Sequence, residues 1–252
     1  MPDIQAESGT TNRTGTKPPN PCHPVAAGLT ERFDFAKHCR YLTRDLQGAI
    51  LDLGTGNGAM IPDLRTAVQD GPPHELHGIE PDSNGLRQAK RTASKHDLDM
   101  NLQLGRAESL PYADDTFDVV LACAVFCTLQ NPSRALEEVH RVVKTDGEFR
   151  FLEHVRSDGL RGYIQDLITP LWKRIDNGCH LDRRTDDWIA AGPFTLDEIE
   201  TLSFSVSPVR PFVRGTATPV GYTETDHRVE NKESASSSLA NSSGDDRSLE
   251  VY

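Results

Sequence analysis

Short apolar runs alternate with longer amphipathic stretches through the central part of this chain. Strand-like runs occupy residues 49–53, 75–80, 100–104, 117–123 and 148–154. Stretches with helical periodicity lie at residues 58–69 and 83–96 and begin again after Asn131. Strands that alternate with helices in this way predict an α/β fold, with a mostly parallel sheet and helices on both of its faces.

The helix after Asn131 has the clearest local signals. Asn131 can cap its first turn, and Pro132 fits the first helical position. Glu137 and Arg141 are spaced for a favourable pair one turn apart. The helix also has one apolar stripe, formed by Leu136, Val139 and Val143. The segment at residues 144–147 then predicts a turn into the strand at residues 148–154.

Two later segments predict further structure. Thr195 and Glu198 have the spacing of a capping box, which predicts a final helix. Strand-like pieces at residues 203–207 and 211–218 would close the sheet as a hairpin and bring it to seven strands.

The insertion at residues 155–194, after the fifth strand, is the least generic part of the chain. Apolar residues recur in it at helical spacing: Tyr163, Ile164, Leu167, Leu171 and Ile175. Because proline interrupts a helix, Pro170 predicts two helical pieces that meet near Thr169. Ligands of parallel α/β folds bind beyond the carboxyl ends of the strands, so this insertion is placed to cover a substrate as a helical lid.

Polar composition marks both ends of the chain. Residues 1–25 are rich in Pro, Thr and Asn, and residues 223–252 are acidic and rich in Ser. Such segments cannot bury enough apolar surface to offset the entropy lost on folding, so we expect two disordered tails. Residues 26–222 remain for one folded domain.

Charge and composition exclude several classes of protein. A formal net charge of −11 argues against a nucleic-acid surface, which needs a basic face. The longest apolar stretch, residues 119–129, is too short to span a bilayer, and the polar N-terminus predicts no signal peptide. Five cysteines without a pairing pattern favour a reduced, cytoplasmic protein. The spacing of His and Cys does not match a metal site, and the oligomeric state is left open.

The segment LDLGTGNG at residues 51–58 has the strongest chemical signal. Gly54, Gly56 and Gly58 alternate between a strand and the following helix. Glycine permits positive φ and lets a ligand approach the backbone without meeting a Cβ atom. The loop therefore offers N–H groups at the positive end of a helix, where an anionic group can bind. Because Ala59 also fits the last position of a dinucleotide fingerprint, the loop alone does not choose among nucleoside-binding families.

Residues downstream narrow the choice. Glu80 ends the second strand, where a carboxylate can accept both hydroxyls of a ribose. The segments GRAESLPYADDTFDVVLA (105–122) and EEVHRVVKTDGEFRFLEH (137–154) follow. With the glycine loop, this pattern resembles the class I S-adenosylmethionine-dependent methyltransferases that have a methyltransferase type 11 domain, over roughly residues 30–218. The resemblance implies a Rossmann-like fold with a seven-stranded sheet, and S-adenosyl-L-methionine as cofactor.

The resemblance also implies which residues bind this cofactor. Its methionine end would contact the glycine loop and the acid before it: Asp52, Gly54, Thr55, Gly56, Asn57 and Gly58. Glu80 and Pro81 would lie at the ribose. The adenine would be bordered by Arg106, Ala107 and Glu108, because its exocyclic amine needs an acceptor. Ala122 and Cys123, at the end of the fourth strand, would lie under the methionine arm.

A narrower resemblance involves residues that follow the fourth and fifth strands. Glu153-His154-Val155, Pro170-Leu-Trp172, Asp176-Asn-Gly-Cys179 and Cys123-Ala-Val-Phe-Cys127 are similar to the methyltransferase-like alkyl thiol methyltransferases. This likeness implies a small-molecule acceptor such as a thiol. The candidate acceptor-binding residues are Phe126, Cys127, Trp172, Cys179 and His180. His154 is a candidate general base, because histidine titrates near neutral pH.

Three other functions stay open on the sequence. The acceptor of such a methyltransferase could be a quinone, an amine or a phospholipid head group, and the acidic chain makes the head group the least expected of these. A nicotinamide-dependent oxidoreductase would need a catalytic Tyr/Lys or His pair that the sequence does not show. A non-catalytic module that binds the cofactor and acts through a partner is the third.

Overall fold

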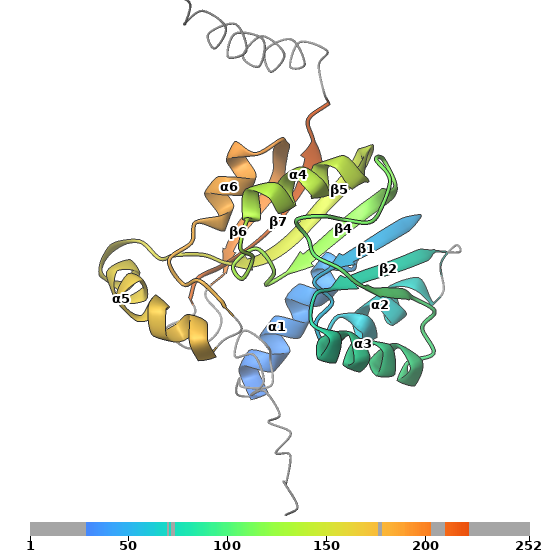
Figure 1. Ribbon diagram of the computed structural model, residues 1–252, viewed down its shortest axis with the longest axis horizontal. Helices are drawn as coiled ribbons and strands as arrows, with labels where there is room; N and C mark the ends of the chain where they lie inside the picture. Colours follow the sequence, from blue (N-terminus) through green and yellow to red (C-terminus); the bar gives the residue numbers. More distant parts are fainter. Residues whose placement is uncertain (1–28, 70, 72–73, 176–177, 203–209, 222–252) are drawn as a thin grey trace, which may run out of the picture. The chain divides into compact units, whose positions relative to one another are not determined.

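The computed structural model describes residues 29–69, 71, 74–175, 178–202 and 210–221. The expected tails at residues 1–25 and 223–252 lie outside the described residues, as does the strand expected at residues 203–207. In chain order the elements are α1 (Leu29–Leu42), β1 (Ala49–Leu53), α2 (Ile61–Val68), β2 (Glu75–Glu80), α3 (Ser83–Lys95), β3 (Asn101–Leu104), β4 (Phe117–Cys123), α4 (Pro132–Val142), β5 (Val143–His154), α5 (Gly159–Ile175), α6 (Thr185–Ala191), β6 (Phe194–Leu202) and β7 (Phe212–Pro219) (Figure 1). Within these ranges, no helix has both the length and the apolar character needed to cross a bilayer.

The strands form one seven-stranded sheet in the order β3-β2-β1-β4-β5-β7-β6. The five strands from β1 to β5 run parallel, whereas β7 is antiparallel to both β5 and β6. This topology confirms the mostly parallel α/β sheet predicted from the sequence. The strand order reverses between β1 and β4, and ligands of open α/β sheets bind beyond the carboxyl ends of the strands at such a point.

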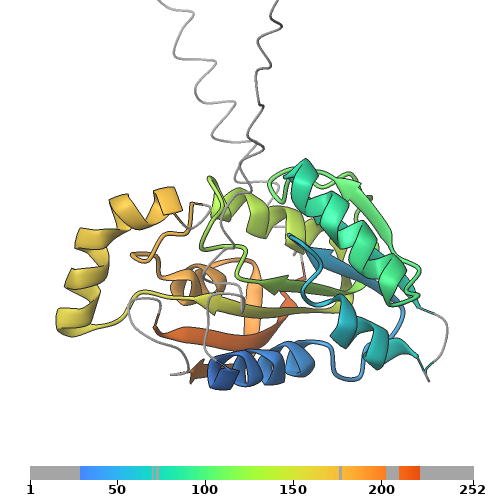
Figure 2. The same ribbon diagram turned by 90° about the horizontal axis from the view of Figure 1, so that it is seen from below.

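Helices cover both faces of this sheet. Figure 2 shows α1 and α4 on opposite sides of the strands. One cluster of buried side chains joins α1, α2 and α3 to the sheet and includes Leu42 and Leu64. The other joins α4 and α6 to the sheet and includes Leu136 and Phe149. The apolar periodicity of the sequence predicts neither α1 nor α6.

The final helix predicted at Thr195 is wrong, because this segment forms β6. β6 pairs with β7 from one end to the other, with Phe194 opposite Pro219 and Leu202 opposite Phe212. A capping box stabilises only one end of a helix, whereas an antiparallel ladder satisfies the backbone along a whole strand. The pairing with β7 therefore outweighs the local helix signal.

α5 is one continuous helix that contains Pro170, so the prediction of two pieces meeting near Thr169 is also wrong. Proline lacks an N–H and leaves the carbonyl of Asp166 without its helical donor. Pro170 and Asp166 are both exposed, so water can satisfy this carbonyl. The hydroxyl of Thr169 also donates to the carbonyl of Gln165 at 2.7 Å, within the same turns.

β5 begins at Val143, earlier than the predicted start at residue 148. Its pairing with β4 passes from Phe117 opposite Val143 to Val119 opposite Glu148. Residues 144–147, where the sequence predicts a turn, therefore form an irregularity inside the strand.

Candidate active site

The glycine loop joins β1 to α2, and each of its three glycines has positive φ: +66° at Gly54, +60° at Gly56 and +84° at Gly58. A Cβ at Gly54 would lie 2.9 Å from Val125, and one at Gly58 would lie 2.6 Å from Ile61. A Cβ at Gly56 would meet nothing closer than the carbonyl of Gly54, at 3.8 Å. Packing therefore requires two of these glycines, whereas the third borders open space that a ligand can use.

Asp52 lies at the end of β1 and is buried, with only 3% of its surface exposed. Its Oδ2 atom has no hydrogen-bond partner among the described residues. Burial, together with the negative charge of Glu80, raises the pKa of Asp52 to about 7. A buried acceptor without a partner is costly. This carboxylate is therefore well placed to receive a cationic group of a ligand.

Glu80, at the end of β2, is attached to the glycine loop. One carboxylate oxygen accepts from the backbone N–H of Gly56 at 2.9 Å, and the other accepts from that of Asp82, also at 2.9 Å. Each oxygen of a carboxylate has two lone pairs, so a carboxylate at this position is chemically suited to a pair of hydroxyls. Pro81, the next residue, is exposed.

The segment after β3 places a second unpartnered acceptor beside this region. Glu108 has a buried Oε1 atom without a partner in the described part of the chain, and the same is true of Oδ1 of Asn57 in the glycine loop. Arg106 lies 3.6 Å from the other oxygen of Glu108, and Ala107 is buried. Such oxygens suit the amino groups of a ligand.

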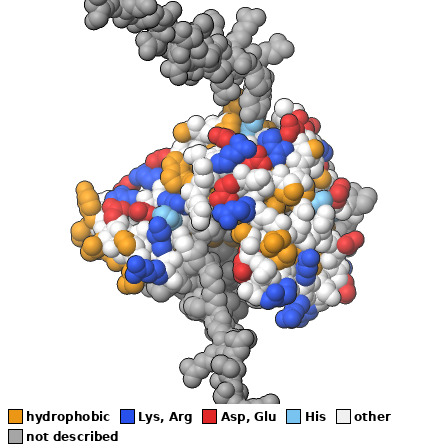
Figure 3. Space-filling view, viewed as in Figure 1, with side chains coloured by type: hydrophobic (Ala, Val, Ile, Leu, Met, Phe, Trp, Pro, Cys, Tyr) orange, Lys and Arg blue, Asp and Glu red, His pale blue; other side chains and the backbone are white. Residues whose placement is uncertain are grey.

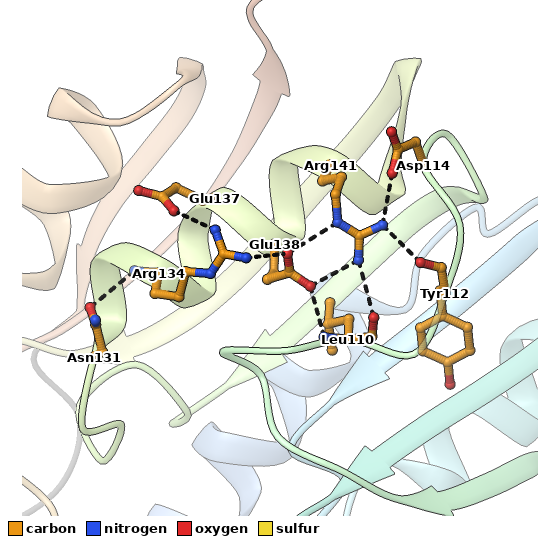
Figure 4. Close-up of polar contacts among 8 residues, drawn as sticks. All are labelled: Leu110, Tyr112, Asp114, Asn131, Arg134, Glu137, Glu138 and Arg141. Carbon is orange, nitrogen blue, oxygen red and sulfur yellow. Dashed lines mark hydrogen bonds and ion pairs between the residues drawn. The ribbon is translucent and has the colours of Figure 1, made fainter. Parts of the chain in front are cut away.

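A network on α4 holds the same segment in place (Figure 4). Glu138 accepts from the backbone N–H of Leu110 at 2.8 Å, while Arg141 donates to the carbonyls of Leu110 and Tyr112 at 3.1 and 2.8 Å. Arg141 also pairs with Glu138 at 2.8 Å and lowers the pKa of this carboxyl. The predicted partner of Arg141, Glu137, instead pairs with Arg134. The network thus anchors the chain that leads away from Glu108.

At the end of β4, Ala122 is fully buried and Cys123 is partly buried. The Cys123 thiol is hydrogen-bonded with the thiol of Cys39 in α1, and this bond together with burial raises the pKa of Cys123 well above its ordinary value. Cys123 is therefore a neutral thiol near neutral pH, which suits a packing role.

Glu153, near the end of β5, organises the turn that follows β4. Its carboxylate accepts three backbone N–H bonds, from Val125 at 2.7 Å, Phe126 at 3.0 Å and Cys127 at 3.2 Å. The side chain is completely buried, and this burial raises its pKa well above the ordinary value. This role is not among the sequence predictions. Its signal is an acid inside the strand segment FRFLEH, because a buried carboxylate needs partners.

The acceptor-binding candidates gather beside this turn. Phe126, Cys127 and Cys179 are buried almost completely, and the backbone N–H of His180 donates to the carbonyl of Cys127 at 2.9 Å. Trp172 is partly buried against the core cluster that contains Cys127 and Cys179. The most accessible of these side chains are thus Trp172 and His180.

His154 is fully buried at the end of β5, with its ring against that of Phe212. Burial lowers the pKa of His154 to about 4, so the imidazole is neutral near pH 7. The pKa of His180 is also lowered, by partial burial and by the positive charges of Arg183 and Lys173. Both histidines are therefore neutral at physiological pH.

The sheet brings the expected cofactor residues side by side. Their strands are neighbours, and Leu53 of β1 lies opposite Ile79 of β2 and Ala122 of β4, while Glu80 lies opposite Leu104 of β3. The acceptor-binding candidates extend from the ends of β4 and β5, on the adjoining part of the same edge. The arrangement is a glycine-lined region with unpartnered acidic oxygens, next to a second, more apolar region. Among the described residues, no group of His, Cys, Asp and Glu side chains could hold a metal ion.

Comparison with known proteins agrees with this geometry. The model of the methyltransferase domain family matches residues 51–151. The fold is similar to the crystal structure of the YcgJ protein from Bacillus subtilis, with a TM-score of 0.59 and 15% identity over 76% of this chain and 100% of that one.

Two curated relatives are more specific. Thiol S-methyltransferase TMT1B of Homo sapiens is 31% identical over 179 residues, which span 67% of this chain and 70% of that protein. Thiol S-methyltransferase TMT1B of Rattus norvegicus is 38% identical over 109 residues, which span 42% of this chain and 45% of that protein. The alignment with the rat protein thus covers less than half of its length, whereas the alignment with the human protein covers more than two thirds. The chain belongs to the class I S-adenosylmethionine-dependent methyltransferases.

Proposed function

We propose that this protein transfers the methyl group of S-adenosylmethionine to a small thiol. The observation that carries the proposal is the site formed by the glycine loop, Asp52 and Glu80 beside an apolar region, in a chain that is 31% identical to a thiol S-methyltransferase over 179 residues. The sulfonium group of the cofactor supplies an already activated methyl group, so the protein must chiefly align a nucleophile with it and exclude water.

The unpartnered acceptors fit the donors of this cofactor. Oδ2 of Asp52 suits its ammonium group, and the open space beside Gly56 leaves room for its carboxylate. Glu80 would hold the ribose hydroxyls, and Oε1 of Glu108 would accept from the adenine amine. Arg106 and Ala107 would border the adenine. Thr55, Asn57, Pro81, Ala122 and Cys123 would complete the walls of this site.

The acceptor side supports a soft nucleophile. A thiol needs little help from a base, because a modest fall in its pKa provides thiolate, which attacks a sulfonium carbon readily. Glu153 fixes the turn after β4, while Phe126, Cys127 and Cys179 would form the apolar base of the acceptor region. Trp172 and His180 would contact the acceptor itself. His180 is the accessible histidine for the released proton, whereas His154 would serve only if the site opened around it.

The described cysteines support a reducing compartment for this activity. Cys39, Cys123, Cys127 and Cys179 are not in disulfide bonds. Buried cysteines outside disulfides are typical of the cytoplasm, and we place the protein there.

The test is methyl transfer by the full chain to a panel of small thiols, phenols and amines, followed across pH. We expect thiols to be methylated, with a rate that rises as the thiol ionises. Gly56→Val is the matched inactive variant, because a branched side chain would fill the open side of the loop. Turnover of a phenol or amine but of no thiol would contradict the proposal that the acceptor is a thiol, and would leave the cofactor assignment intact. Cofactor binding without turnover of any acceptor would favour a non-catalytic module.

A further inference from the structure

α5 turns its apolar side away from the body of the protein. Five large apolar residues on this helix are strongly exposed: Leu160 (76%), Tyr163 (69%), Ile164 (48%), Leu167 (81%) and Leu171 (65%). Their spacing of three and four residues places them on one face of the helix. Figure 3 shows hydrophobic side chains gathered at the left of the view, where Figure 1 places α5. Contiguous apolar patches of this kind on a protein usually mark an interaction site.

The opposite side of α5 packs inward, with Ile168 and Trp172 against the core and with Gln165 and Thr169 as its buried polar residues. Gln165 is fully buried, and its amide accepts from the N–H of Ser157 and donates to the carbonyl of Arg210, both at 2.7 Å. At Gly162, a Cβ would lie only 2.2 Å from the carbonyl of Ser157, so glycine permits close contact there. Because the inward side is satisfied and tightly packed, α5 cannot simply rotate to bury its apolar face.

The exposed charges of α5 that lie outside ion pairs with the rest of the chain are positive. Arg161, Lys173 and Arg174 are exposed along the helix. The acidic residue of the helix, Asp166, is held by Arg156 in two contacts of 2.7 Å. An apolar face with cations beside it and at the end of the helix is therefore present on a chain whose formal net charge is −11.

These charges favour a lipid surface over a second copy of the chain. A second copy of α5 would bring the same exposed cations to the contact and no acidic partner for them. An anionic membrane instead attracts these cations and accepts the apolar side chains between them.

We propose that α5 is a membrane-docking helix that lies in the plane of an anionic phospholipid surface. Leu160, Leu167 and Leu171 enter the boundary between head groups and acyl chains, and Tyr163 lies at the level of the head groups. The cations at the two ends contact lipid phosphates. This surface binding is independent of the methyl acceptor, and it does not require a membrane span.

The test is flotation of the full chain with phosphatidylcholine vesicles that contain or lack phosphatidylserine. We expect binding to the anionic vesicles, at least about tenfold weaker binding to the neutral ones, and a loss of binding at high salt. Leu160→Gln/Leu167→Gln should reduce binding by at least about tenfold, because two exposed anchors become polar while helix propensity is kept. Ile199→Gln is the matched control on exposed β6 and should bind as the parent does.

A second pair of variants checks the charges. Arg161→Gln/Arg174→Gln should weaken binding to anionic vesicles, whereas Lys90→Gln/Lys95→Gln on α3 should not. Thermal melting with and without S-adenosylhomocysteine shows whether each variant is folded. Equal binding by the α5 variants and the parent, or no binding to anionic vesicles, would overturn the proposal. A dimer in light scattering that Leu160→Gln/Leu167→Gln dissociates would overturn it as well, and would make this face an interface between two copies.

Discussion

At the level of single residues, Asp52 is the clearest case of a side chain that lowers the stability of the folded protein and suits a ligand. Its carboxylate is buried, one oxygen has no partner among the described residues, and its pKa is raised to about 7. A carboxyl with a raised pKa is harder to ionise in the folded protein than in the unfolded chain. A bound cationic group would offset this cost, which ties the residue to ligand binding.

Replacing Asp52 with Asn should stabilise the ligand-free protein at pH 8 and weaken cofactor binding. Between about pH 4 and pH 7 the folded protein retains a proton on Asp52 that the unfolded chain has released, so stability falls as pH rises through this window. The variant lacks this loss, so its free energy of unfolding at pH 8 should exceed that of the parent by up to about 4 kcal/mol. Urea unfolding of both proteins at pH 5 and pH 8 measures the difference. An equal loss of stability with pH in both would assign it to another group.

Cofactor affinity should depend on the same proton. Only the ionised form of Asp52 pairs well with an ammonium group, so binding should be about tenfold weaker at pH 6 than on the plateau above pH 8. Calorimetric titration with S-adenosylhomocysteine in buffers of different ionisation enthalpy would detect the released proton. A flat affinity from pH 6 to pH 8 would show that Asp52 does not contact the ligand amine.

At the level of elements, α4 has a second task besides covering the sheet. Glu138 and Arg141 hold the backbone at Leu110 and Tyr112, which continues from the expected adenine residues (Figure 4). Two residues on a rigid helix thus position a segment that has little regular structure of its own. A helix that fixes a binding loop can affect affinity without touching the ligand.

Arg141→Lys should raise the KM for S-adenosylmethionine about tenfold while changing kcat less than about twofold. Lysine keeps the charge but cannot make the forked contacts to two carbonyls and Glu138. Arg134→Lys is the matched control, because Arg134 contacts Glu137 and Glu138 but not the loop. If the two variants have the same KM and kcat, the network stabilises the fold but does not position the loop for cofactor binding.

Elements with local sequence signals were predicted correctly. Predictions were wrong or missing where contacts between distant residues determine the structure. The turn at the glycine loop and the position of Glu80 at the end of β2 were predictable, because both follow from adjacent strand and helix residues. β6 was not, because its strand form depends on pairing with β7, which no local pattern reveals. The role of Glu153 likewise depends on N–H groups contributed by the turn after another strand.

At the level of the whole molecule, the tails provide a simple prediction. A chain trimmed to residues 26–222 should keep its melting temperature and its affinity for S-adenosylhomocysteine, because the composition of the removed ends offers no apolar face. Scanning calorimetry and titration of both chains test this. A fall of several degrees on trimming would show that an end packs against the domain.

Glu153 has a consequence for how such enzymes diverge. Its carboxylate ties β5 to the turn after β4, so the ends of these two strands move together. The proposed methyl-donor site and the proposed acceptor region therefore both border this fixed pair of strand ends. Change is easier in the segment that follows β5, where α5 and the residues around His180 lie. A lineage could therefore alter its choice of nucleophile, or its attachment to a surface, by revising one stretch of chain and leaving methyl-donor binding intact.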